Sequence, residues 1–131
     1  MSIARLNPDT LSKNPAFTQA VAVENPQKLI YVGGQNGVNV TGQVVGNDIA
    51  SQSEQAFKNV VAALTAAGAT LQDVIKMTIY VVQGQSLQAA FMGAQKAGNM
   101  NAHPPAISVI IVAGLANPQF LIEIEAVAAL V

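Results

Sequence analysis

Two carboxylates stand inside one of the most apolar segments of the chain. Glu123 and Glu125 lie in the run 120–128, FLIEIEAVA, whose other members are Phe, Leu, Ile, Val and Ala. Because side chains alternate along a β-strand, both glutamates are expected on one face and Ile122 and Ile124 on the other. A charge in such a strand is costly unless it is paired, hydrogen-bonded or open to a cleft. The pattern therefore indicates a candidate functional site.

The spacing of the two glutamates limits the chemistry they could perform together. Residues i and i+2 of a strand place their Cβ atoms about 6.5–7 Å apart, a separation that a glycosidase carboxylate pair could also show. Neighbours on one strand cannot flank a sugar from opposite sides, so we set the glycosidase interpretation aside. A paired or solvated glutamate at the rim of a sheet stays an open alternative for both Glu123 and Glu125.

Two further features could contribute to a site. Gly33-Gly34 permits the close approach of a small molecule or of another backbone, although a bulge or strand end would use glycine equally well. No lysine or serine follows these glycines at the spacing of a phosphate-binding loop. His103 is the only histidine and could titrate near neutral pH, but a lone histidine in a polar loop is more often a surface residue.

The elements that would position these residues follow from periodicity and turn signals. One helix is expected to begin at Asp48, or at the Ser51…Glu54 capping box, and to end at Gly68; a second covers Ser86 to about Ala97. The expected strands are 16–23, 28–33, a short one at 43–45, 74–82, 106–113 and 120–128.

This order, β-β-β-α-β-α-β-β, predicts an α+β fold: a mixed sheet with both helices on one face. The other face, largely apolar, would then need a partner. Only 10% of the residues are charged and 51% are hydrophobic, so part of the apolar surface is expected in a subunit interface. The length of 131 residues suits one domain, 1–131.

Composition also bears on compartment and partners. The chain has no cysteine, its first ten residues contain no signal-peptide core, and its longest apolar run, around 105–116, is too short to span a bilayer. We therefore expect a cytoplasmic protein with no membrane partner. The six basic residues are scattered singly, so no nucleic-acid partner is expected. No metal, flavin, nicotinamide or pyridoxal site is suggested, so no cofactor is expected.

Several motifs, in order, resemble one family. They are Gly33-Gly34-Gln35, the helix with Asp48, Gln52, Asn59 and Leu64, the strand 73–81, Pro105-Ala106-Ile107-Ser108, Leu115 and Ile122-Glu123-Ile124-Glu125-Ala126. Together they resemble the YjgF family of reactive-intermediate (imine/enamine) deaminases, also described as endoribonuclease L-PSP. The resemblance implies a chorismate-mutase-like fold and a homotrimer with small-molecule ligands in clefts between subunits.

The resemblance also assigns roles to single residues. It makes Glu123 the catalytic group that activates the attacking water, and Gly34 a backbone contact to the ligand. Phe17 falls where the family often has a tyrosine lining the pocket, although a plain core phenylalanine is the alternative. Ile107 falls where imino-acid hydrolases of the family carry an arginine that binds the substrate carboxylate; isoleucine removes this bidentate anion clamp.

Three hypotheses about function follow. The first is a hydrolase of imines or enamines whose substrate is not an imino acid. The second is a trimeric protein that binds a small apolar ligand in the same cleft without catalysis. The third is an endoribonuclease or translation inhibitor, which would need a contiguous basic groove across subunits.

Overall fold

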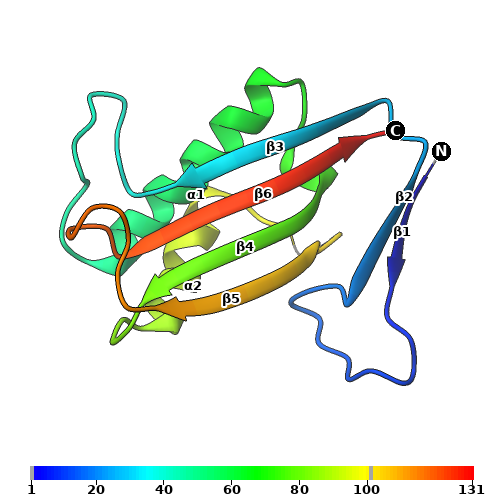
Figure 1. The fold of residues 1–131 in the computed structure, drawn as a ribbon, viewed down its shortest axis with the longest axis horizontal. Helices are drawn as coiled ribbons and strands as arrows, with labels where there is room; N and C mark the ends of the chain where they lie inside the picture. The colour runs from blue at the N-terminus through cyan, green and yellow to red at the C-terminus, as the bar shows by residue number, and fades with distance from the viewer. Residues whose placement is uncertain (1, 101) are drawn as a thin grey trace.

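A four-stranded mixed sheet forms the centre of the computed structural model, which describes residues 2–100 and 102–131. Its strands run in the spatial order β3 (Lys28–Gln35), β6 (Ile122–Leu130), β4 (Val74–Val82) and β5 (Ala106–Val112) (Figure 1). β6 is antiparallel to both of its neighbours, whereas β4 and β5 are parallel and are connected through helix α2. The α+β class and the mixed sheet expected from the sequence are confirmed.

Two helices cover one face of this sheet, as expected (Figure 1). α1 (Ile49–Ala66) begins at Asp48, whose side chain accepts a hydrogen bond from the Ser51 backbone N–H, and it is followed by Gly68 at φ +82°, a left-handed conformation that favours glycine. α2 (Leu87–Ala97) is capped in the same way by Ser86. A single 3₁₀ turn, η1 (Leu71–Asp73), leads into β4.

The core lies between the helices and the sheet. Phe57, Val60 and Leu64 form the buried stripe of α1 that their spacing predicts. β6 alternates as expected, with Ile122 and Ile124 buried against the helices and both glutamates on the other face. Gly93 lets α2 approach α1 closely, because a Cβ at this position would overlap the backbone of Ala50.

The first part of the chain differs from its prediction. The strand expected at 16–23 is wrong: β2 covers Ala20–Glu24 and pairs with β1 (Ser2–Leu6), which the sequence analysis missed. Residues 16–19 belong instead to a loop, since Thr18 bonds to the carbonyls of Pro104 and Pro105. The short strand expected at 43–45 is reduced to one bridge between Val38 and Val44.

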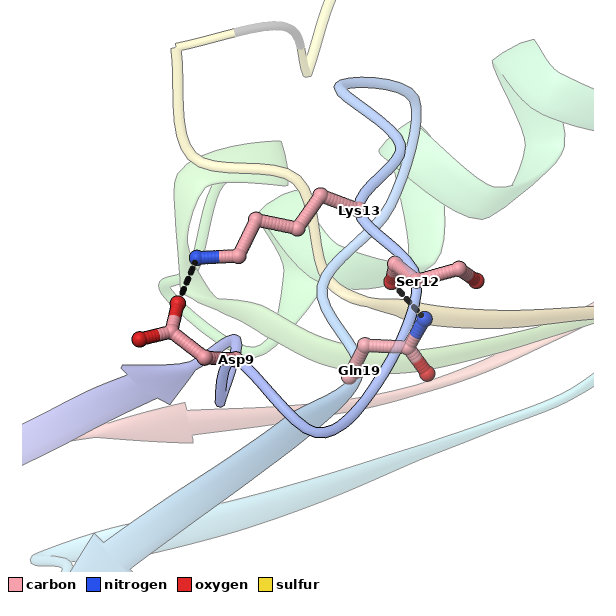
Figure 2. A network of polar contacts seen from close by, with 4 residues as sticks. All are labelled: Asp9, Ser12, Lys13 and Gln19. Atoms are coloured by element: carbon pink, nitrogen blue, oxygen red, sulfur yellow. Dashed lines mark hydrogen bonds and ion pairs between the residues drawn. The ribbon is translucent and has the colours of Figure 1, made fainter.

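The loop that joins β1 to β2 is held by its own polar contacts (Figure 2). Lys13 forms an ion pair with Asp9 at 2.8 Å, and the Gln19 side-chain amide donates to the Ser12 carbonyl at 2.8 Å. Exposed contacts of this kind contribute little stability singly. They nevertheless help to fix the path of the loop that carries Phe17.

The face of the sheet that carries no helix is mixed rather than largely apolar, which corrects the expectation. Exposed Leu29 and Tyr31 on β3 and Ile110 on β5 accompany polar residues of β4, β5 and β6. We call this surface the open face. Within residues 2–100 and 102–131, no helix combines the length and the apolar character that crossing a membrane requires.

Candidate functional site

Glu123 lies half-buried on the open face, in the strand β6 that occupies the interior of the sheet. The side-chain amide of Asn36 donates to its Oε1 at 3.3 Å and to the carbonyl of Ile122 at 2.9 Å. Asn59 of α1 in turn donates to the carbonyls of Asn36 and Val38, at 3.1 and 2.8 Å. The position of the carboxylate is therefore supported by a chain of contacts that reaches the first helix.

Gly34 lies directly against this carboxylate. The pairing of β3 with β6 shifts register between Val32 and Gln35, so Gly33 and Gly34 form a bulge. A Cβ at residue 34 would overlap Glu123 Oε2 and would lie 2.6 Å from its Cδ, whereas a Cβ at residue 33 would meet no atom within 4 Å. The absence of a side chain at Gly34 thus leaves the space that the carboxylate occupies.

Other polar side chains share the open face with Glu123. Tyr80 stands opposite Glu123 in the β4–β6 register, and Thr78 stands between Glu125 and Ser108. The Lys76 ammonium donates to the Ser108 hydroxyl at 2.8 Å. Ser108, on the face opposite Ile107 as alternation predicts, therefore shares its face with the two glutamates.

No described residue forms an ion pair with either glutamate of β6. The two ion pairs in the part of the chain that the structure describes join Lys13 to Asp9 and Lys58 to Glu54. The Glu123 carboxylate thus meets an amide donor and open space. Such an environment leaves its oxygens able to accept a proton from water.

Ile107 and Phe17 lie elsewhere, on a cavity in the helix-covered side of the sheet. The cavity has a volume of about 320 Å³ and lies between α1, α2, the sheet and the loop that carries Phe17. Register explains the position of Ile107, because it pairs with Met77, whose side chain is buried in the core. Thr18 holds Phe17 there by bonding to the backbone just before β5.

The wall of this cavity carries no ionisable side chain among the described residues. Ser53 at its inner end donates its hydroxyl to the Ala90 carbonyl at 2.6 Å, and the other polar side chains are the amides of Gln95 and Asn99. The remaining wall is aliphatic, aromatic or thioether. A charged ligand group would therefore lose its hydration without meeting an opposite charge.

The four residues predicted for one site thus form two pairs within a chain. Gly34 and Glu123 meet on the open face, and Phe17 and Ile107 meet on the cavity. His103 is exposed in the loop before β5. The site also contains Asn36 and Tyr80, which the sequence patterns did not single out. Alternation along 74–82 could have placed Tyr80 on one face with Thr78, but its position opposite Glu123 depends on the register of β4 with β6.

Comparison with known proteins identifies the family. The model of the endoribonuclease L-PSP family matches residues 9–130. The chain belongs to this family. It is the YjgF or Rid family that the motifs resemble.

Individual relatives agree with this assignment. A RutC family protein of Pyrococcus horikoshii is 34% identical over 119 residues, which cover 86% of this chain and 85% of that protein. A 2-iminobutanoate/2-iminopropanoate deaminase of Dermatophagoides farinae is 37% identical over 84 residues, a segment spanning 62% of this chain and 63% of that protein.

A solved structure of the Rid family is similar over the whole fold. The protein of unknown function YyfB from Yersinia pestis superposes with a TM-score of 0.85 at 35% identity, covering 99% of this chain and 100% of that one. The chorismate-mutase-like fold implied by the resemblance is thereby confirmed.

Proposed function

We propose that this YjgF-family protein hydrolyses neutral imines or enamines in clefts between subunits, with Glu123 as the catalytic group. The observation that carries the proposal is the Glu123 carboxylate, held by Asn36, set against Gly34 and without a cationic partner among the described residues. Family membership supports it, as do relatives named 2-iminobutanoate/2-iminopropanoate deaminase.

The reaction needs one group that can accept and return a proton. Water adds to the imine carbon while Glu123 takes a proton from it, and this proton passes to the nitrogen. The resulting carbinolamine loses its C–N bond as the hydroxyl proton leaves for the nitrogen. The products are the carbonyl compound and ammonia, so one water is consumed for each imine.

A homotrimer would complete the site. Glu123 and Ile107 lie on opposite faces of one sheet, so a substrate bound against Ile107 cannot reach the carboxylate of the same chain. A neighbouring copy that presents its open face would bring its own Glu123 and Gly34 to the cavity lined by Phe17 and Ile107. The mixed character of the open face, with exposed Tyr31 and Ile110, supports such an interface.

Ile107 sets the substrate class within this proposal. An imino acid would bring its carboxylate to an apolar wall, where an unpaired buried charge costs several kcal/mol. A neutral imine carries no such cost. The substrate is therefore an imine or enamine without a carboxylate beside the reacting carbon.

One observation favours a second function, binding without catalysis. The cavity is apolar, and in a single chain it is separated from Glu123 by the sheet, which suits a protein that only holds a small ligand. A ribonuclease would instead need a basic groove. Among the described residues, Lys76 is the only cation that bonds to a polar side chain of the open face, the hydroxyl of Ser108. We therefore expect no nucleic-acid partner.

Ammonia release tests the proposal. The substrates are 2-aminoacrylate and a neutral imine with a phenyl group on carbon and only hydrogen on nitrogen, each generated in the reaction and compared with its spontaneous hydrolysis. We expect acceleration of the neutral imine only, loss of at least about a hundredfold in Glu123→Ala, and a gain on 2-aminoacrylate in Ile107→Arg. Equal acceleration by wild type and Glu123→Ala would exclude Glu123 as the catalytic group, and no acceleration by wild type would exclude catalysis and leave the binding function.

A further inference from the structure

We propose that the cavity beneath α2 is a pocket for an uncharged, two-ring-sized apolar group. This inference rests on the proposed function, because it names the part of the substrate that the protein recognises. It is tested by binding rather than by turnover. The pocket would serve the catalytic and the binding function alike.

The cavity is deep. Its floor includes Met77, Val81, Ile122 and Ile124, which are at most 1% exposed. An apolar patch used only to dock another surface would end at the outer layer of side chains. Here the space reaches the buried layer of the sheet, as small-molecule sites do.

Small residues on the second helix create this space. Ala90 and Ala94 face the cavity from α2, and Gly98 lines it just beyond the end of that helix. Larger side chains stand at the rim, where Phe91 is 56% exposed and Val109 is 52% exposed. The small residues inside leave the space unfilled, and the large apolar residues at the rim are exposed to contact a ligand.

The volume indicates the size of the ligand. An engineered cavity of about 150 Å³ lined by Leu, Ile and Phe stays dry and binds benzene. The present cavity of about 320 Å³ is roughly twice as large. Two fused aromatic rings, or an aliphatic group of similar bulk, therefore fit its capacity.

The polar groups on the wall select against charge. The amides of Gln95 and Asn99 are neutral, and Ser53 donates its hydroxyl to the Ala90 carbonyl. Ile107 stands where the resemblance to the family places an arginine in imino-acid hydrolases. A carboxylated ligand must therefore give up hydration without meeting a cation, whereas a neutral ring system gains from burial.

Calorimetric titration with indole and indole-3-carboxylate tests the proposal on the full chain. We expect saturable binding of one indole per chain and binding of the carboxylate at least about tenfold weaker. Ala94→Phe fills the cavity from α2 and Val109→Trp fills its mouth from β5, and each is expected to weaken indole binding at least about tenfold. Ala62→Phe, an exposed alanine on α1 outside the cavity, is the matched control and should bind like wild type.

Several outcomes would overturn the pocket. They are the absence of saturable indole binding, equal affinity for the two probes, or unchanged binding in both filling variants. Indole affinity that rises on dilution would also overturn it, since side chains of a second copy would then occupy the cavity.

The two proposals fail separately. Indole binding without any imine hydrolysis would remove the proposed catalysis and keep the pocket. Glu123-dependent hydrolysis in a protein that does not bind indole would remove the pocket and keep the catalysis.

Discussion

The two faces of the sheet differ more than their shared strands suggest. Along β6, Ile122 and Ile124 form the floor of an apolar cavity, while Glu123 and Glu125 stand on the open face among hydroxyl and amide groups. One side of the strand offers space without charge, and the other offers charge without an enclosed space. The alternation of a single strand thus separates what a ligand would touch from what could transfer a proton.

This separation explains how specificity can change while the candidate catalytic group stays. Within one chain, Ile107 and Phe17 do not contact Glu123, because the sheet lies between them. Ile107 and the residues around it give this cavity mostly apolar walls. The predictions below test how independent the two faces are, beginning with the largest expected effect.

The first prediction compares neighbours on β6. Ile124→Ala removes packing from the buried face and should lower the free energy of unfolding by about 2–5 kcal/mol. Glu125→Gln changes the open face and should stay within about 0.5 kcal/mol of wild type. Denaturant unfolding at one protein concentration measures both. Similar losses in the two variants would show that the charge of Glu125 contributes as much to stability as the packing of Ile124.

The second prediction perturbs only the open face. Gly34→Ala should displace the Glu123 carboxylate and lower kcat/KM for imine hydrolysis about a hundredfold, since a misplacement of about 1 Å can cost that much. Gly33→Ala is the matched control and should keep its activity, because a Cβ there meets no neighbour. Indole affinity measured on both variants shows whether the two faces act together. Unchanged affinity in Gly34→Ala would mean that they are independent, and weaker binding would mean that the open face of a neighbouring copy contributes to the pocket.

The third prediction concerns the amide that holds the carboxylate. Asn36→Ala removes the donor to Glu123 and to the Ile122 carbonyl, and we expect about a tenfold loss in kcat/KM. The melting temperature, measured in parallel, should stay close to that of wild type. Asn59 bonds to the backbone carbonyls of residues 36 and 38, which the substitution retains. Unchanged kcat/KM would mean that Asn36 does not position Glu123.

The smallest expected effect lies at the start of α1. A hydrogen bond from the backbone N–H of Ser51 holds the pKa of the Asp48 carboxyl below its ordinary value, and a hydrogen bond from the Ser51 hydroxyl adds a smaller effect in the same direction. Asp48 therefore stabilises the fold above its ordinary pKa, and this contribution is lost as the pH falls through the lowered value.

Asp48→Asn keeps a capping side chain but removes the charge. We expect its melting temperature to lie slightly below that of wild type at neutral pH, with the difference vanishing in acid. Thermal melts from about pH 7 to pH 3 measure this. A difference that persists in acid would show that Asp48 acts through something other than its ionised carboxylate.

The sequence was sufficient for most of the sheet and both helices. The runs 74–82, 106–113 and 120–128 predict β4, β5 and β6 within two residues, because apolar alternation is strong there. The opening segment was not predictable in this way. Residues 16–19 precede an apolar run and were joined to it, but Thr18 takes backbone partners that lie 86 residues or more further along the chain.

The candidate site was predictable only in part. The placement of both glutamates on one face followed from alternation, and Gly34 was identified by resemblance. The division into two half-sites required the register of β4 with β5, which no local pattern contains. The cavity could not be predicted without the packing of the elements. Ala90 and Ala94 favour a helix in any case, so their presence in the sequence does not show that they leave a space.

The position of β6 has a consequence for how the protein is made. β3 and β4 are never hydrogen-bonded to each other; the last strand of the sheet in chain order lies between them. While the chain is being synthesised, both strands must wait with unpaired edges until β6 has left the ribosome. Such edges can pair with other chains, so we expect the nascent protein to depend on holding factors to avoid aggregation.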